Sequence, residues 1–446
     1  MAHLSHLTLT NFRNFIQLDL DLNPGVCVFF GANAQGKTTL LEAVYLLAIA
    51  RSFRAENERE VVNFGAALQG EPALVGGVIE KQQERLSVYI GYQPQPVRGS
   101  SKPELEPQPE PQPGPQMDKR SNGEPLPAGR PWNSTTTPRP DGVWSYSVRK
   151  QIRVSRISRT AAELVGMVGA VLFSADDIEL IYGPPSGRRR YLDILISQSD
   201  PLYIKALQRY QRVVRQRNQL LKTLREGRAE ARELDFWDDE LVREGAWLTW
   251  RRKEAMGHLS TLGAEHYQRL GGADQRFQME YSPSVPPAED CLSTEERFRK
   301  SLSAARQRES VLAATEVGPH RDDFALSING LDMGTFASRG EARTAALALR
   351  LAEASYISLV RGEEPIVLLD DVLSEMDISR RRRVLEKITG YEQVMITTTD
   401  PKLIQQLLGP EAAYFRVEAG QVIALEHFSE SASYADEMAE EGRATS

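Results

Sequence analysis

Hydrophobic and polar positions change period along the chain, and the changes divide it into regions. In the first 92 residues, apolar residues at every second position predict half-buried strands over 16–22 and 86–90. The apolar run 26–30 predicts a buried strand, and Leu40, Leu41, Val44 and Leu47 then follow at helical spacing. A strand, a loop and a helix in this order predict an α/β domain.

The composition changes sharply after this region. Residues 93–141 hold 13 of the 25 prolines of the chain and almost no aliphatic side chains. A segment of this kind cannot bury apolar surface, so we expect a disordered, proline-rich insertion. Regular structure resumes in the region 142–196, where "VWSYSVRKQIRVS" predicts a strand that pairs with the one ending near Tyr92.

A helical pattern then takes over, and we expect a helical arm over 197–275. The first helix carries apolar residues in steps of three and four (Tyr203, Leu207, Tyr210, Val214, Leu221 and Leu224), with Arg217 interrupting the seam. A second periodic segment follows a polar break, which predicts an antiparallel hairpin. Strands and helices alternate again over 276–427, so the arm is an insertion into one α/β head, and 428–446 is an acidic, disordered tail.

Composition and charge narrow the class of protein. The chain has 446 residues, a formal net charge of −7 and two cysteines, Cys27 and Cys291, which exclude a disulfide framework and favour a reducing compartment. No basic region followed by an apolar segment opens the chain, and no apolar run is long enough to span a membrane. We therefore expect a cytoplasmic protein with no membrane partner.

The strongest candidate chemistry lies in "GANAQGKT", which fits the phosphate-binding pattern G-x-x-x-x-G-K-[ST]. The residues expected to surround the phosphates of ATP are Gly31, Ala32, Asn33, Ala34, Gln35, Gly36, Lys37, Thr38 and Thr39. Lys37 is expected to hold the β- and γ-phosphates, and Thr38 to bind Mg²⁺ directly. The loop lies between the predicted strand and the predicted helix, as this mechanism requires.

Hydrolysis of ATP also needs acidic residues at the end of a neighbouring strand, and "IVLLDD" ends in Asp370 and Asp371. We expect Asp370 to hold Mg²⁺ and Asp371 to orient the attacking water. More than 300 residues separate Lys37 from Asp370, and a long gap filled by a helical arm is typical of the ABC-type ATPases of chromosome biology. The predicted fold is therefore an ABC-type P-loop ATPase head, a mixed sheet with flanking helices, with an inserted arm.

That class also requires a signature loop at the start of a helix upstream of the two aspartates. Ser338 and Gly340 open the alanine-rich segment 341–356, where free amides could contact the γ-phosphate of a nucleotide held by a second subunit. A serine at this position is also a common helix cap, and the two interpretations are compatible. The loop therefore predicts a dimer with the nucleotide between its subunits.

Several segments together resemble the RecF family of bacterial DNA-repair and recombination ATPases. The resemblance rests on "LTNFRNF" (9–15), the phosphate loop, "VLFSADDIELIYGPPSGRRRYLD" (171–193), "YQRVVRQRNQLLK" (210–222), "GPHRDDF" (318–324), the signature segment 336–354 and "LLDDVLSEMD" (368–377). It implies a weak, DNA-dependent ATPase that forms a homodimer on ATP and binds double-stranded and gapped or single-stranded DNA. It further implies cooperation with RecO and RecR to load RecA at gaps, in recombination, replication restart and the SOS response.

The chain departs from the family pattern at a few positions. Arg339 and Glu341 stand where glutamines are usual, and Asp371 is one methylene shorter than the usual glutamate. A shorter base positions water less well, which predicts slow hydrolysis. No switch histidine follows the strand "EQVMITTTD", where Thr398 or Thr399 takes that region, and Ser174 is the nearest equivalent of the glutamine found in transporters.

Basic residues suggest a DNA-binding surface. Lys205, Arg209, Arg212, Arg215 and Lys222 follow helical steps, and arginine runs occur at 188–190 and 379–383. For any single residue, a solvated face paired with acids is the simpler interpretation. Arg217 is expected to be a buried ion-pair partner, and His320 alone is poor evidence for a metal other than Mg²⁺.

Three rival functions remain. The long gap between the phosphate loop and the signature disfavours an ABC transporter subunit, and the short hairpin disfavours an SMC-like architectural protein. A scaffold that uses ATP only as a structural ligand is not excluded by the sequence, and a turnover assay separates it from an ATPase.

Overall fold

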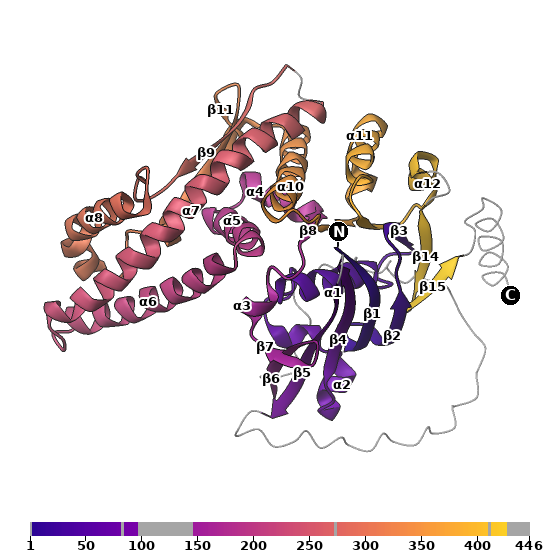
Figure 1. Cartoon of the computed structure of the whole chain (residues 1–446), viewed down its shortest axis with the longest axis horizontal. Helices are drawn as coiled ribbons and strands as arrows, with labels where there is room; N and C mark the ends of the chain where they lie inside the picture. Colours follow the sequence, from indigo (N-terminus) through magenta and orange to yellow (C-terminus); the bar gives the residue numbers. More distant parts are fainter. Residues whose placement is uncertain (1, 82–83, 97–145, 272–273, 409–411, 426–446) are drawn as a thin grey trace, which may run out of the picture.

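The structure is a computed structural model that describes residues 2–81, 84–96, 146–271, 274–408 and 412–425 (Figure 1). Two six-stranded sheets form the head, and a group of long helices with a small sheet extends from it as an arm (Figure 1). The chain therefore has the mixed α/β architecture that the sequence predicts, with flanking helices and an inserted helical region. None of the helices in these ranges is both long and apolar enough to cross a bilayer.

The parallel sheet positions the candidate site. Its order is β15-β14-β3-β13-β12-β8, and all neighbours are parallel except the edge strand β15. The strands are β3 (Gly25–Phe30), β8 (Ala170–Ser174), β12 (Ile366–Asp370), β13 (Gln393–Thr398), β14 (Ala413–Glu418) and β15 (Gln421–Leu425). Because the carboxyl ends of parallel strands meet at one edge, residues 30, 174, 370 and 398 lie along that edge.

The second sheet is antiparallel, with the order β2-β1-β4-β5-β6-β7. Its strands are β1 (Ala2–Phe12), β2 (Phe15–Asp21), β4 (Ala73–Lys81), β5 (Glu84–Pro96), β6 (Tyr146–Val154) and β7 (Ile157–Arg159). Helix α1 (Lys37–Ile49) packs against strands of both sheets, and all of its residues except Thr38 are buried. Short helices complete this part of the head: η1 (Glu58–Val61), α2 (Phe64–Gln69) and α3 (Ala161–Leu164).

The strand predicted after the proline-rich segment is confirmed, but the expected start of that segment at residue 93 is wrong. Strand β6 pairs with β5, and the ladder continues as far as the pair Pro96–Tyr146. Beyond Tyr92 the other neighbour, β4, no longer pairs with β5, so Pro94 and Pro96 lie on a free edge where a missing N–H costs little. The rest of the expected insertion, from residue 97, and the acidic tail from 428 lie outside the described residues.

The arm contains the two predicted antiparallel helices, α6 (Pro201–Arg225) and α7 (Leu234–Arg269), preceded by α5 (Pro185–Ser199) and joined by η3 (Ala231–Glu233). It extends beyond the expected limit at residue 275. Helix α8 (Cys291–Leu312) packs on α7, and β9 (Phe277–Ser282) contacts α7 and pairs with β10 (Asp323–Ile328). With β11 (Leu331–Asp332) these strands form a separate sheet, so residues 277–332 are not part of the head sheets.

Helix α10 (Arg339–Arg361) connects the arm to the head. It packs between α7 and β8, and its buried face is rich in alanine and leucine, which allows a close approach. The shorter elements are η2 (Ala175–Ile178), α4 (Glu179–Tyr182), η4 (Pro319–Arg321), α9 (Met333–Phe336), η5 (Val372–Glu375), α11 (Ile378–Ile388) and α12 (Lys402–Leu408).

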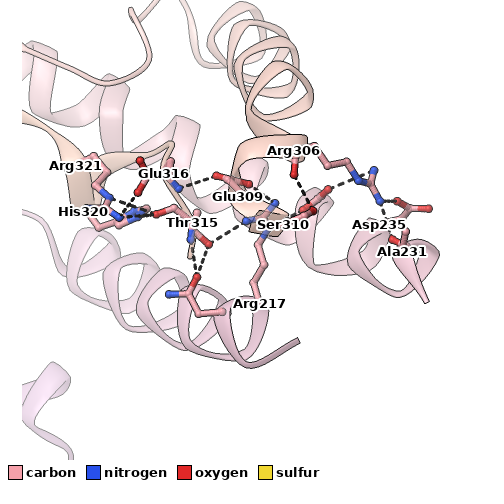
Figure 2. Close-up of polar contacts among 12 residues, drawn as sticks. Arg217, Ala231, Asp235, Arg306, Glu309, Ser310, Thr315, Glu316, His320 and Arg321 are labelled. Carbon is pink, nitrogen blue, oxygen red and sulfur yellow. Dashed lines mark hydrogen bonds and ion pairs between the residues drawn. The ribbon is translucent and has the colours of Figure 1, made fainter. Parts of the chain in front are cut away.

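Arg217 is a buried ion-pair partner, as the sequence predicts. Its side chain has no exposed surface and donates to Asp238 Oδ1 at 2.7 Å, Glu309 Oε2 at 2.7 Å and Thr315 Oγ1 at 2.9 Å (Figure 2). Glu309 is equally buried, and its other oxygen accepts the amide of Glu316 at 2.7 Å. The charge that interrupts the apolar seam of α6 is therefore neutralised and fully hydrogen-bonded inside the arm.

Candidate nucleotide site

The predicted phosphate loop connects β3 to α1 and depends on its two glycines. Gly31 and Gly36 have φ angles of 153° and 114°, in the region that favours glycine. A Cβ on Gly31 would lie 2.3 Å from the carbonyl oxygen of Val417, and one on Gly36 would lie 2.6 Å from Asn14 Nδ2. Only glycine fits at either position, so the spacing of the motif is imposed by its neighbours as well as by its ligand.

The loop ends at the start of α1, where backbone amides lie free of side-chain caps. Gly36 is the N-cap residue, and no side chain hydrogen-bonds the first turn. Free amides and the positive end of the helix dipole form an anion site, which fits the phosphates of ATP. Ala32, Asn33 and Ala34 are exposed at the tip of the loop, and the side chain of Thr39 is buried within α1.

Gln35 fixes the loop to the turn between β14 and β15. Its side-chain oxygen accepts the amide of Ala419 at 2.6 Å, and its carbonyl accepts Asn14 Nδ2 at 3.1 Å. The loop is therefore held from two sides, although residues 35 and 419 lie 384 positions apart in the chain.

Lys37 lies inside the curve of the loop. Its ammonium donates to the carbonyl oxygens of Gly31 at 2.7 Å and Ala32 at 2.8 Å. Burial lowers the pKa of Lys37 below its ordinary value, and the charges of Asp371 and Asp370 oppose that shift. The lysine is thus directed into the loop by hydrogen bonds and lies within the field of both predicted carboxylates.

Asp370 meets Thr38 at the carboxyl edge of the parallel sheet. Asp370 Oδ1 accepts the hydroxyls of Thr38 and Thr397, each at 2.8 Å. Burial raises the pKa of Asp370 above its ordinary value, and the two hydroxyl donors oppose the shift. A carboxylate beside a threonine hydroxyl is an oxygen donor set that suits Mg²⁺, so the pair fits the expected metal.

Thr397 was not among the predicted site residues. It aligns with Asp370 in the parallel ladder of β12 and β13, and its hydroxyl also accepts the amide of Asp371 at 3.0 Å. The sequence prediction placed Thr398 or Thr399 in this region, but Thr398 instead exchanges hydrogen bonds with the backbone of Asp400. The only available signal was strand register, because the threonine that faces the aspartates must lie opposite Asp370.

Asp371 has a distinct backbone and an unsatisfied side chain. Its φ angle is 52°, in the left-handed region that aspartate tolerates better than most residues. Asp371 Oδ1 is buried and finds no hydrogen-bond partner within the described residues. A buried carboxylate oxygen without a partner is costly in a folded protein and fits a site that receives a water molecule or a metal ligand.

Ser174 lies beside the same centre. It pairs with Asp370 in the ladder of β8 and β12, and its amide donates to Asp177 Oδ2 at 2.8 Å. The carboxyl edge therefore brings together residues from the phosphate loop and from three adjacent strands, β8, β12 and β13.

The predicted signature serine caps α10. Ser338 Oγ accepts the amide of Glu341 at 3.3 Å, and the Glu341 carboxylate accepts the Ser338 amide at 2.9 Å and its hydroxyl at 2.8 Å. These bonds form a capping box, and with Gln275 they lower the pKa of Glu341. The unusual glutamate therefore closes the cap, while Arg339 is exposed and Gly340 lines a small cavity with Ser174 and Met376.

The predicted basic residues divide into structural and exposed groups. Arg188 forms a two-bond pair with Asp323, Arg189 donates to the carbonyl of Asp322, and Arg381 is buried against the carbonyls of Leu373 and Met376. On α6, Arg209 pairs with Glu244. The exposed basic side chains of that helix include Lys205, Arg212, Arg215 and Lys222.

His320 is satisfied by protein groups. Its Nε2 lies 3.0 Å from the carbonyl oxygen of Thr315, and its Nδ1 lies 2.6 Å from the hydroxyl of Tyr210. Burial lowers the pKa of His320 below its ordinary value. In the ranges that the structure covers, no three histidine, cysteine, aspartate or glutamate side chains are grouped as a metal site would need.

Known proteins resemble this chain over nearly its whole length. The AAA domain family matches residues 6–84. The "DNA replication and repair protein RecF" of Herpetosiphon aurantiacus is 38% identical over 401 residues, which cover 89% of this chain and 93% of the relative. The protein of the same name from Chloroflexus aurantiacus is 35% identical, covering 95% of this chain and all of the relative.

Solved structures agree with these relatives. A structure of "the recombination mediator protein RecF-ATPrS in RecFOR pathway" is 29% identical with a TM-score of 0.76, and covers 95% of this chain and 98% of its own. The corresponding "RecF-ATP" structure is 28% identical with the same TM-score. An Smc head domain from Pyrococcus yayanosii, 12% identical with a TM-score of 0.51, shares the fold alone.

Proposed function

The chain belongs to the RecF family of DNA replication and repair proteins, and from that membership we propose that it is an ATP-dependent DNA-binding protein of recombinational repair. It forms a homodimer on ATP, hydrolyses ATP slowly as a switch, and acts with RecR and RecO in the cytoplasm to load RecA at single-strand gaps. The roles in replication restart and in the SOS response belong to the same proposal.

The observation that carries the proposal is the junction of Thr38, Asp370 and Thr397 beside the unpartnered oxygen of Asp371. Bound Mg²⁺ would supply charge neutralisation of the phosphates. Lys37 and the free amides of α1 would hold the phosphate oxygens, Thr38 and Asp370 would hold the metal, and Asp371 would orient the attacking water. Thr38 and Asp370 lie 332 positions apart in the chain and are joined by a hydrogen bond, which supports this assignment.

Ser338 and Gly340 are proposed to contact the nucleotide of the second subunit. Their position at the start of the 23-residue helix α10 supports this, because the positive end of a long helix dipole attracts an anion. The capping box with Glu341 holds the serine in place and keeps the negative charge of Glu341 hydrogen-bonded.

Two rival functions are less well supported. An SMC-like architectural protein is disfavoured because the Smc head is less similar, in both sequence and fold, than the RecF structures. A scaffold that binds ATP without hydrolysis would have no need for the unpartnered carboxylate oxygen of Asp371, and a turnover assay separates the two.

The proposal is tested by the oligomeric state of the chain, measured by light scattering with and without Mg-ATP and gapped DNA. We expect a dimer on ATP that tightens on DNA, and we expect Lys37→Ala to abolish it, since the phosphates lose their main cation. Lys300→Ala, an exposed lysine on α8, is the matched control. Normal ATP-dependent dimers of Lys37→Ala would overturn the assignment of the loop.

A further inference from the structure

A large cleft separates the head from the arm, and the nucleotide site does not use it. We call it the head–arm cleft; its volume is about 810 Å³. Arg51, Tyr92 and Lys150 line it on the head side, and Arg190, Gln208 and Gln211 line it on the arm side. A cleft of this size can hold a small part of a larger ligand.

The cleft contains two arginines that lack acidic partners. Arg51 and Arg190 are exposed, and neither makes an ion pair or a side-chain hydrogen bond within the described ranges. Partial desolvation of the guanidinium, followed by the nearby charge of Arg51, lowers the pKa of Arg190. Two like charges that line one cleft and form no ion pair with an acid make a site that an anion would stabilise.

Most of the acidic residues that line the cleft already pair with other protein groups. Glu58 accepts Lys150 at 2.7 Å, and Asp193 accepts Arg252 at 2.8 Å and the hydroxyl of Tyr203 at 2.7 Å. Glu56 is the remaining acid on the lining. The positive charge of Arg51 and Arg190 is thus only partly compensated.

The helix face that lines the cleft continues along α6 beyond it. Ile204, Gln208 and Gln211 line it at helical steps of four and three, and the same steps lead to Arg215 and then to Lys222. Both are exposed, and neither forms an ion pair with an acid of the described residues. In Figure 1, α6 is the arm helix nearer the head, and it contacts α3.

We propose that the head–arm cleft and the α6 residues Arg215 and Lys222 bind the phosphate backbone of DNA. This inference rests on the proposed function, to which it adds the surface that contacts the nucleic acid. The tyrosines of the cleft, Tyr45, Tyr92 and Tyr210, are buried and offer no face for stacking with bases. Binding is therefore electrostatic and independent of base sequence.

The spacing of the cations suits a phosphate backbone. Seven residues of α-helix separate Arg215 from Lys222, a rise of roughly 10 Å. Long, flexible side chains on such a spacing can reach separate phosphates along one strand, whose charges repeat every ~3.4 Å of helix axis. Arg51 and Arg190 then hold the backbone at the inner end of the same line.

The test compares two double variants of one helix. Arg215→Ala with Lys222→Ala removes the cleft-facing pair, and Lys205→Ala with Arg212→Ala removes an arginine and a lysine that are also seven residues apart. The control pair is exposed too. At 100° per residue it lies roughly 80° around the helix from the cleft-facing pair. The probe is a fluorescein-labelled duplex of about 30 base pairs. It is titrated with the protein in the presence of Mg-ATP, at several salt concentrations between about 50 and 200 mM.

We expect the cleft-facing variant to lose about tenfold in affinity and to lower the slope of log K against log salt by about 1 to 2, because one or two phosphate contacts are lost. Arg51→Ala with Arg190→Ala should act in the same direction. The control pair should change both quantities much less. Equal effects of the two α6 pairs would overturn the inference and leave the proposed function intact.

A second measurement does not depend on charge. Gln211→Cys places a thiol on the cleft lining, and Gln216→Cys places one on an exposed position of α6 outside it. DNA should slow maleimide labelling of the first variant and not of the second. The labelling of the half-buried native Cys291 is measured in the unaltered chain and subtracted. If DNA binds normally but does not slow the labelling of Gln211→Cys, the inference is overturned. If the unaltered chain does not bind DNA, the proposed function is overturned as well.

Discussion

The nucleotide site and the interior of the arm both contain buried charges, but their hydrogen bonding differs. In the arm, Arg217 has three partners and both oxygens of Glu309 accept hydrogen bonds (Figure 2). At the nucleotide site, Asp371 Oδ1 has no partner in the described residues, and Lys37 donates only to carbonyls of its own loop. The arm cluster is complete without a ligand, whereas the head cluster has capacity that a ligand can use.

The difference has a physical reason. A buried ion pair holds helices together only when every polar atom is satisfied, because an uncompensated charge costs several kcal/mol. A binding site must leave donors and acceptors free, and their desolvation is an energetic cost to the folded protein. We therefore expect substitutions in the arm cluster to act on stability and substitutions in the head cluster to act on chemistry.

The largest effect is expected from Arg217→Met. The substitution leaves Glu309 charged, buried and without its main counter-ion, which should lower the free energy of unfolding by about 3–5 kcal/mol. Urea unfolding can be followed by tryptophan fluorescence, since Trp237, Trp247 and Trp250 lie on α7.

Arg306→Ala is the control for that substitution. Arg306 also contacts Asp235 and Asp238, but its side chain is 38% exposed, so the loss should stay below about 1 kcal/mol. Similar losses for the two variants would mean that burial and complete hydrogen bonding do not distinguish the arm cluster.

The second effect concerns Asp371 and should appear in turnover. Asp371→Asn keeps the shape of the side chain and suits the left-handed backbone, but removes the charge that would accept a proton. We expect kcat for ATP hydrolysis to fall about 100-fold, equivalent to about 2.7 kcal/mol, with ATP-driven dimerisation retained. Phosphate release and light scattering measure the two properties separately.

Asp371→Glu sharpens the same comparison. A longer side chain should bring the carboxylate closer to the water and raise turnover several-fold, reduced by the strain of glutamate at a φ of 52°. Full turnover by Asp371→Asn would contradict the role of Asp371 as the base.

The sequence predicted the parts of the site that depend on local pattern. The phosphate loop follows from the spacing of two glycines and a lysine, and Asp370 follows from an apolar run that ends in an acid. Arg217 was predicted as buried because it interrupts an apolar seam. Each of these signals lies within a few residues, where helix and strand periods determine which side chains share a face.

The parts that were missed depend on distant pairing. Thr397 faces the aspartates only because β13 aligns with β12 in one register, and a shift by one residue would have presented Thr398 instead. The arm was predicted too short because β9 pairs with β10 across the length of α8. Neither the register of β12 and β13 nor the pairing of β9 and β10 can be deduced from the local sequence pattern of these strands.

The smallest of these effects is the response of the arm to acid. His266 of α7 is buried and hydrogen-bonded to Ser355, and burial, together with Lys387 and Arg269, lowers its pKa to about 4. Because the pKa in the folded state lies below that of the unfolded chain, near 6.5, this contribution to stability is present above pH 6.5 and is lost as the pH falls toward 4. Between pH 7 and pH 5 the loss should be about 2 kcal/mol.

His266→Gln should remove most of this pH dependence while keeping a hydrogen bond to Ser355, and His258→Gln, an exposed histidine of the same helix, should leave it unchanged. Asp370 in the head has the opposite sign: because burial raises its pKa, its contribution to stability grows as the pH falls. Urea midpoints at pH 7 and pH 5, followed by the tryptophans of α7, would separate the two regions. If His266→Gln and the unaltered chain lose equal stability between pH 7 and pH 5, the acid sensitivity does not arise from His266.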